Sequence, residues 1–133
     1  MINKKEIYGI NSTGSIKNVV KEIELSGLII EKLTGRKPVY FRSGTAYYDD
    51  VSIKIANNLG YKIAGFTISA DYGATLSAEK IKNNLLKAKN GDIILSHINR
   101  PKSDISKGFI EAIPILINNG YSFVKLSEVD LIR

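Results

Sequence analysis

Three polar residues follow apolar segments typical of strands, and their types suit acid–base chemistry. His97 is the only histidine and ends the apolar segment 92–97, while Arg42 and Asp71 follow two earlier apolar segments. The carboxyl ends of parallel strands meet at one edge of a sheet, so we expect these side chains to share that edge. An aspartate beside a histidine fixes its tautomer and favours its protonated form, which can protonate a leaving group. The alternative is a structural histidine beside an unrelated Arg–Asp surface pair.

The composition and the absence of known motifs exclude several classes of functional site. The 133 residues include no cysteine and one histidine, which excludes disulfides, thiol catalysis and any recognisable metal-ligand spacing. The glycine-rich phosphate-binding motifs and the G-x-S-x-G nucleophile motif are missing. No apolar run reaches the roughly 18 residues of a membrane span. The N-terminus does not have the pattern of a signal peptide, so the chain as it stands is expected to be cytoplasmic.

The charge of the chain leaves one further class open. Nineteen basic and 13 acidic residues give a net charge of +6, which suits an anionic partner. The lysines are spread along the predicted helices, which favours a solvated surface. Four aromatic residues near Arg42 could stack on nucleic-acid bases, although packing is the favoured interpretation: Tyr40, Phe41, Tyr47 and Tyr48. A basic nucleic-acid-binding α/β domain therefore stays as an alternative.

The apolar pattern predicts alternating helices and strands. Helices are expected at 15–33, 49–59, 77–88 and 106–119, and strands at 39–42, 61–68, 92–97 and 121–126. This order predicts a single α/β domain over residues 1–133 with about four parallel strands, either a small open sheet or part of a (β/α) barrel. Within the strand at 92–97, side chains should alternate, with Leu95 and His97 on one face and Ile94 and Ser96 on the other.

Five ordered segments resemble one known family. They are LTGRKPVYFR at 33–42, NLGY at 58–61, SADY at 69–72, GDIILSH at 91–97 and GYSFVKL at 120–126. With these spacings, from about Tyr8 to the end, the chain resembles the polysaccharide deacetylases, or NodB-homology domains. The resemblance implies a distorted (β/α) barrel and a metal-dependent hydrolase that removes acetyl groups from glycans. It covers the C-terminal half or more of such a domain.

The resemblance also implies roles for individual residues. Arg42 matches the arginine that orients a catalytic aspartate base, Asp71 the partner of the catalytic histidine, and His97 that histidine, the general acid. Leu95 matches a leucine of the acetyl pocket, and Tyr72 stands where many members have tryptophan, so both are expected to contact substrate.

Two departures from the family pattern matter. Residues 43–46 read Ser-Gly-Thr-Ala where Pro-Pro-Tyr-Gly is common, and the motifs that supply the base and the metal ligands have no counterpart. Zinc or another divalent metal is implied for a complete domain, but none for this chain alone, which is expected to be truncated and inactive by itself. The expected partner is an acetylated glycan, together with self-association or a polypeptide that supplies the missing half. A catalytically dead glycan-binding module is the first alternative to this function, ahead of the nucleic-acid-binding domain.

Overall fold

The computed structural model describes residues 6–7 and 9–131, and the chain divides into two compact units. The N-terminal unit comprises Met1–Gly65 and the C-terminal unit Phe66–Arg133. Each unit has its own buried cluster of apolar side chains, and each is described by itself. The prediction of a single domain over residues 1–133 stays a prediction.

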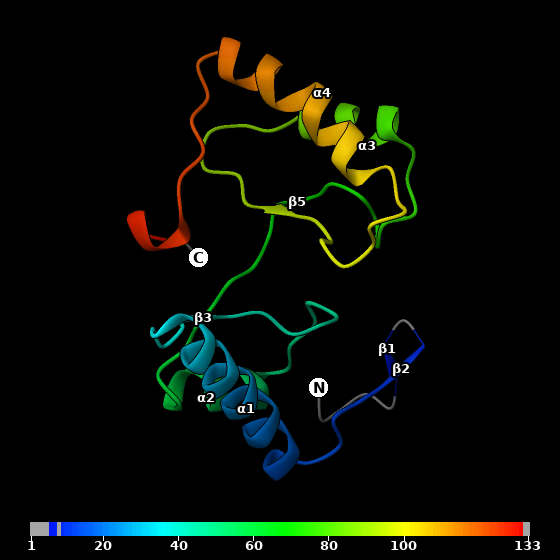
Figure 1. Ribbon diagram of the computed structural model, residues 1–133. Helices are drawn as coiled ribbons and strands as arrows, with labels where there is room; N and C mark the ends of the chain where they lie inside the picture. Colours follow the sequence, from blue (N-terminus) through cyan, green and yellow to red (C-terminus); the bar gives the residue numbers. More distant parts are fainter. Residues whose placement is uncertain (1–5, 8, 132–133) are drawn as a thin grey trace. The chain divides into compact units, whose positions relative to one another are not determined.

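The N-terminal unit is built around two helices. Its elements are β1 (Glu6–Ile7), β2 (Ile10–Asn11), α1 (Ile16–Thr34), β3 (Tyr40–Phe41), α2 (Asp50–Asn58) and β4 (Lys62–Ile63). β1 and β2 form an antiparallel pair, and β3 and β4 a parallel pair. Helix α1 begins where the Ser15 hydroxyl accepts the Asn18 N–H and ends at Gly35, whose φ of 71° is a left-handed conformation that suits glycine. Figure 1 shows α1 and α2 together with β3.

Close packing between α1 and Tyr61, three residues after α2, depends on a glycine. Val19 and Ile23 of α1 join Ile55 and Tyr61 in the buried cluster of this unit. A Cβ on Gly27 would lie 2.0 Å from the Tyr61 hydroxyl oxygen, so only glycine leaves room for the tyrosine here.

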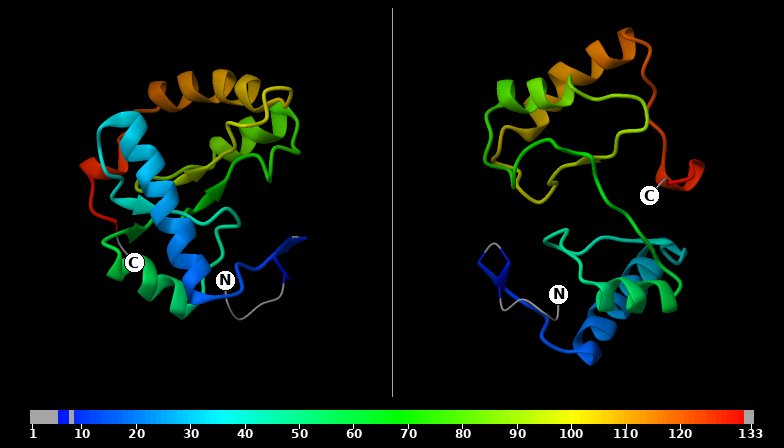
Figure 2. Two further views of the ribbon diagram at one scale, coloured as in Figure 1. Left: turned by 60° about the horizontal axis from the view of Figure 1, so that its bottom comes forward. Right: turned by 180° about the vertical axis from the view of Figure 1, so that it is seen from behind.

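The C-terminal unit places two helices on one side of a short parallel pair of strands. Its elements are β5 (Ile68–Ser69), α3 (Ala78–Leu85), β6 (Ile94–Leu95), α4 (Ile105–Asn118) and a 3₁₀ helix (Leu126–Glu128). α3 and α4 lie side by side in all the views of Figures 1 and 2. Ile81 and Leu85 of α3 pack with Ala70 and Ala112 in its buried cluster.

The helix predictions are confirmed, with ends within three residues, whereas two strand predictions are wrong. The expected strand at 61–68 is two strands, β4 and β5, which belong to different units. Residues 121–125 form no strand, because no strand within 6–7 and 9–131 pairs with them, and Phe123 is 54% exposed. An extended segment without a ladder partner gains no inter-strand hydrogen bonds.

The parallel strands form separate pairs rather than one sheet. β3 pairs with β4 and β5 with β6, and no hydrogen-bonded ladder joins these pairs among the described residues. A partial barrel is therefore not confirmed by the strand pairing. No helix within the described residues is both long enough and apolar enough to cross a membrane.

Candidate active site around Asp71 and His97

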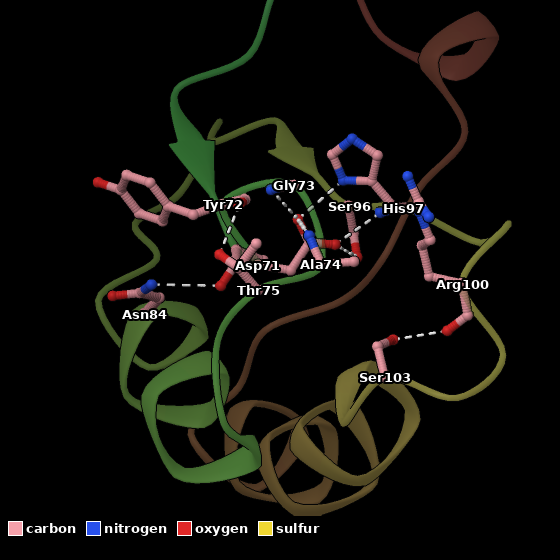
Figure 3. Close-up of polar contacts among 11 residues, drawn as sticks. Asp71, Tyr72, Gly73, Ala74, Thr75, Asn84, Ser96, His97, Arg100 and Ser103 are labelled. Carbon is pink, nitrogen blue, oxygen red and sulfur yellow. Dashed lines mark hydrogen bonds and ion pairs between the residues drawn. The ribbon is translucent and has the colours of Figure 1, made fainter.

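Strand pairing brings Asp71 and His97 together. In the parallel pair, Ile68 lies beside Ile94 and Ser69 beside Leu95. One further bond, from the Ala70 N–H to the Leu95 carbonyl at 2.9 Å, extends the pairing beyond the strands. Because the two strands run in parallel, the residues that follow β5 and β6 lie at the same end of the pair and come together there, as Figure 3 shows.

Asp71 accepts hydrogen bonds on both carboxylate oxygens from the segment after β6. Its Oδ1 lies 2.8 Å from Nδ1 of His97. Its Oδ2 accepts the Ser96 hydroxyl at 2.8 Å and the His97 backbone N–H at 2.7 Å. The aspartate therefore fixes both the ring and the backbone of His97.

The loop after Asp71 supplies two further donors. The N–H groups of Gly73 and Ala74 point at Oδ1 from 3.2 and 3.3 Å. Tyr72, Gly73 and Ala74 all have positive φ, at 47°, 76° and 66°, which is strained for the two residues that carry a Cβ. The hydrogen bonds to Asp71 hold the loop in this conformation.

These donors keep Asp71 ionised. The residue is fully buried, and burial by itself raises the pKa of a carboxyl group. Hydrogen bonds from the backbone and side chain of His97, from Ser96 and from Ala74 outweigh this effect, so the pKa of Asp71 is lower than its ordinary value of 3.8. An ionised carboxylate only accepts hydrogen bonds, so Nδ1 of His97 carries the proton.

The other ring nitrogen of His97 is directed away from Asp71 in Figure 3. The His97 side chain is 36% exposed, while that of Asp71 is fully enclosed. The arrangement is thus a buried anion that orients an accessible imidazole. It can position Nε2 to give or take a proton.

Arg42 is engaged within the N-terminal unit. Its Nε donates to the Ala64 carbonyl at 2.9 Å and its Nη2 to the Gly65 carbonyl at 2.5 Å. The expectation that Arg42 shares an edge with Asp71 and His97, and its catalytic role, stay predictions.

The aromatic residues near Arg42 are involved in packing and hydrogen bonds. Phe41 packs against the buried cluster of its unit, and the Tyr48 hydroxyl accepts the Ser43 N–H at 2.9 Å. Burial raises the pKa of Tyr48 more than its hydrogen bonds with Ser43 and the charge of Arg42 lower it. This arrangement does not favour a base-stacking surface.

Ser96 is the site residue that strand alternation missed. The prediction that Ser96 faces away from His97 is wrong, because both side chains reach the Asp71 carboxylate. Strand β6 ends at Leu95, so the alternation of side chains does not extend to the two residues beyond it. No pattern in the sequence indicates this hydroxyl.

The two expected substrate contacts differ in position. Leu95 is partly buried in β6, and Tyr72 is 65% exposed. In Figure 3 the Tyr72 ring points away from His97, toward the side of Asn84. Contact of either residue with substrate stays a prediction.

The described residues do not fit a metal site of the kind that the family implies. No group of three or more His, Cys, Asp or Glu residues within 6–7 and 9–131 could hold a metal ion. His97 already uses Nδ1 for Asp71, and both Asp71 oxygens are occupied by donors.

Comparison with known proteins gives one sequence match and several structural matches. No family model matches the sequence. The chain is 32% identical over 98 residues to a peptidoglycan-N-acetylglucosamine deacetylase from Bacillus cereus, a match that includes 71% of this chain and 46% of that protein. The chain therefore spans about half the length of this curated relative.

Three solved structures share the fold. A peptidoglycan N-acetylglucosamine deacetylase matches with a TM-score of 0.77 and 23% identity, over 90% of this chain and 58% of that one. The Xyl-CE4 domain of a xylanase from the hindgut metagenome of Trinervitermes trinervoides matches with 0.74 and 27%, over 86% and 55%. A CE4 family pseudoenzyme from Bacillus anthracis matches with 0.76 and 20%, over 86% and 40%.

The chain shares its fold with a little over half of the first two of these CE4 structures, whose complete domain is a (β/α) barrel. The sequence match and the fold together confirm the resemblance of this chain to a polysaccharide deacetylase domain of the NodB type.

Proposed function

We propose that this chain forms the acid-side part of a polysaccharide deacetylase-like domain and serves the hydrolysis of acetyl groups on glycans. The observation that carries the proposal is the contact between the fully buried, ionised Asp71 and the accessible His97, at 2.8 Å. The relationship to deacetylases supports the substrate class, an acetylated glycan or oligosaccharide.

His97 acts as the proton donor in this proposal. When the carbon–nitrogen bond of an acetamido group breaks, the leaving amine must gain a proton. Nε2 of the imidazolium gives that proton. The neutral ring keeps the proton on Nδ1, which donates a hydrogen bond to Asp71. The aspartate stabilises the charged ring before transfer and holds the ring in position throughout. Leu95 and Tyr72 contact the substrate, and Arg42 orients a base in the complete site.

We further propose that the 133-residue chain alone does not turn over substrate. In the family, a divalent metal activates water and polarises the carbonyl. The described residues do not fit such a site, so they would not hold this metal. Hydrolysis then requires a polypeptide that supplies the base and the metal ligands.

A complementation assay tests the proposal. The purified chain is mixed with the metal-binding half of a related deacetylase, and acetate release from N-acetylated chitin oligomers is measured with and without added zinc. We expect release only from the mixture, and none when His97→Ala replaces the native chain. Binding of the oligomers is measured in parallel by calorimetry. If the mixture releases no acetate and the oligomers do not bind, the proposed function is wrong.

The same assay, together with a measurement of DNA binding, separates the alternatives. Glycan binding without release in any mixture would indicate a binding module. Salt-dependent binding of DNA with no binding of glycans would indicate a nucleic-acid-binding domain. The relationship to deacetylases favours neither alternative.

A further inference from the structure

A shallow hollow lies beside the Asp71 loop, and two of its residues, Tyr72 and Asn84, lie on the side away from His97 in Figure 3. Its volume is about 330 Å³. The residues around it are Tyr72, Leu76, Lys80, Asn83, Asn84 and Lys87. No acidic residue lines it, and all of these residues belong to the C-terminal unit.

The polar residues of the hollow share one face of a helix. Lys80, Asn83, Asn84 and Lys87 are spaced at i, i+3, i+4 and i+7, which places them together along α3 and the turn after it. Ile81 and Leu85 occupy the buried face of the same helix. The surface therefore presents a pair of amides between two ammonium groups.

The two lysines of the hollow have no carboxylate partner within the described part of the chain. Lys87 Nζ lies 3.4 Å from the Asn84 side-chain oxygen, and Lys80 has no ion pair there. By contrast, Lys82 of the same helix pairs with Glu111 at 3.3 Å. The positive charge of the hollow is thus available to an anionic ligand.

Tyr72 adds an aromatic ring at the edge of the hollow. Its φ of 47° is rare for a bulky residue, and the Thr75 hydroxyl donates to its carbonyl at 2.8 Å. This conformation presents the exposed ring on the side of Asn84 (Figure 3). An exposed tyrosine offers a flat apolar face and a hydroxyl, which together suit a sugar ring.

Asn84 links the hollow to the active-site loop. Its side-chain N–H donates at 3.2 Å to the carbonyl of Ala70, the residue directly before Asp71. A ligand in the hollow would therefore lie against the same loop that orients His97.

We propose that the hollow binds carboxylate-bearing sugar units of a glycan. The proposal rests on the proposed function, since it adds a subsite for the same polymer. The lysines are seven positions apart, about 10 Å along a helix, so an extended chain fits better than one small anion. Amides between the charges suit hydroxyl groups. Nucleic acid is less favoured, because the hollow has one aromatic ring and no arginine.

Binding of three ligands of matched length tests the proposal with the full chain. They are an oligogalacturonate, a neutral N-acetylated chitin oligomer and a single-stranded oligonucleotide. We expect the oligogalacturonate to bind more tightly than the neutral oligomer. The double substitution Lys80→Glu/Lys87→Glu should weaken it roughly tenfold or more, since two favourable charge contacts become repulsive.

A matched control changes charge elsewhere. Lys89→Glu/Lys102→Glu alters two exposed lysines of the same unit outside the hollow and should leave the affinity within about twofold. Tyr72→Ala should weaken both glycans. An equal loss in the control, or oligonucleotide binding as tight and as dependent on Lys80 and Lys87, would overturn the proposal.

The outcomes distinguish this subsite from the function on which it rests. If the neutral oligomer binds and acetate release in the complemented assay depends on His97, but the carboxylated glycan gains nothing from the lysines, only the subsite fails. If carboxylated glycan binds through the lysines but the complemented assay releases no acetate, the subsite stands and the deacetylase proposal fails.

Discussion

Oδ1 of Asp71 lies 2.8 Å from Nδ1 of His97, and the carboxylate that makes this contact has no exposed surface. Burial of the carboxylate reduces the screening of its charge by solvent, and the other ring nitrogen of His97 is directed away from it. The active-site proposal and several predictions depend on this pair.

Replacing Asp71 by asparagine should impair proton transfer. Asp71→Asn keeps the size of the side chain but removes the charge that orients and stabilises a protonated His97. In the complemented assay we expect acetate release to fall roughly 10²- to 10⁴-fold, the usual contribution of a positioned acid. Binding of the acetylated oligomer should change little. A variant with full activity would show that His97 acts without Asp71.

Stability should depend on pH through the same carboxylate. The pKa of Asp71 is lower in the folded chain than its ordinary value of 3.8. Its contribution to the free energy of unfolding is therefore complete above pH 3.8 and is lost as the pH falls through the pKa of the folded state. Urea unfolding of the wild type between about pH 6 and pH 2 should show a loss of stability below about pH 4. Asp71→Asn should lack this part of the loss. If the free energy of unfolding of the two proteins fell in parallel with pH, the acid-induced loss would not come from Asp71.

Ser96→Ala should destabilise the C-terminal unit. The substitution removes the only side-chain donor to Oδ2 within the described residues and leaves a buried charge with one donor fewer. A hydrogen bond to a charged group contributes about 1.5–3 kcal/mol. Ser103→Ala removes an exposed hydroxyl that donates to the Arg100 carbonyl, so it is a control with little expected effect. Equal unfolding midpoints for both variants would contradict the role of Ser96.

Gly108→Ala should disturb the contact between α3 and α4. A Cβ at this position would lie 2.6 Å from Cγ2 of Ile81 and 3.0 Å from the Ala78 carbonyl oxygen. Overpacking costs roughly 1–3 kcal/mol, and the better helix propensity of alanine offsets up to about 1 kcal/mol. Thermal unfolding should show a lower midpoint, whereas Gly44→Ala, with nothing within 4 Å, should not. An unchanged midpoint for Gly108→Ala would mean that the helices separate without cost.

The purified chain should self-associate through α1. Val19 and Ile23 bury one side of this helix, but Leu25, Leu28 and Leu33 are 52%, 62% and 79% exposed. Apolar surface of this kind recruits partners. Sedimentation velocity at increasing concentration should show larger species.

Substitutions on α1 give the matching controls for self-association. Leu28→Gln/Leu33→Gln should reduce the larger species, and Ile110→Gln, at an exposed position of α4, should not. A monomer at every concentration would contradict the prediction.

The helices and the main parts of the candidate site could be predicted from the order of residues alone. Ser15 and Asp49 are helix N-caps, and their hydrogen bonds form within three residues. Such signals are local, so the order of the chain contains them. The meeting of Asp71 and His97 was also predictable, because both follow strands that pair in parallel. The resemblance to deacetylases added the expected roles of these residues.

Tertiary structure decided what depends on partners distant in sequence. A strand needs a neighbour, so the apolar residues 121–125 stayed irregular, and the expected strand at 61–68 divided between two pairs. The Ser96 hydroxyl can donate a hydrogen bond to Asp71 because β6 ends at Leu95, one residue before Ser96. The lysines of the hollow lie near Tyr72 because folding of the C-terminal unit brings the loop after β5 and one face of α3 together.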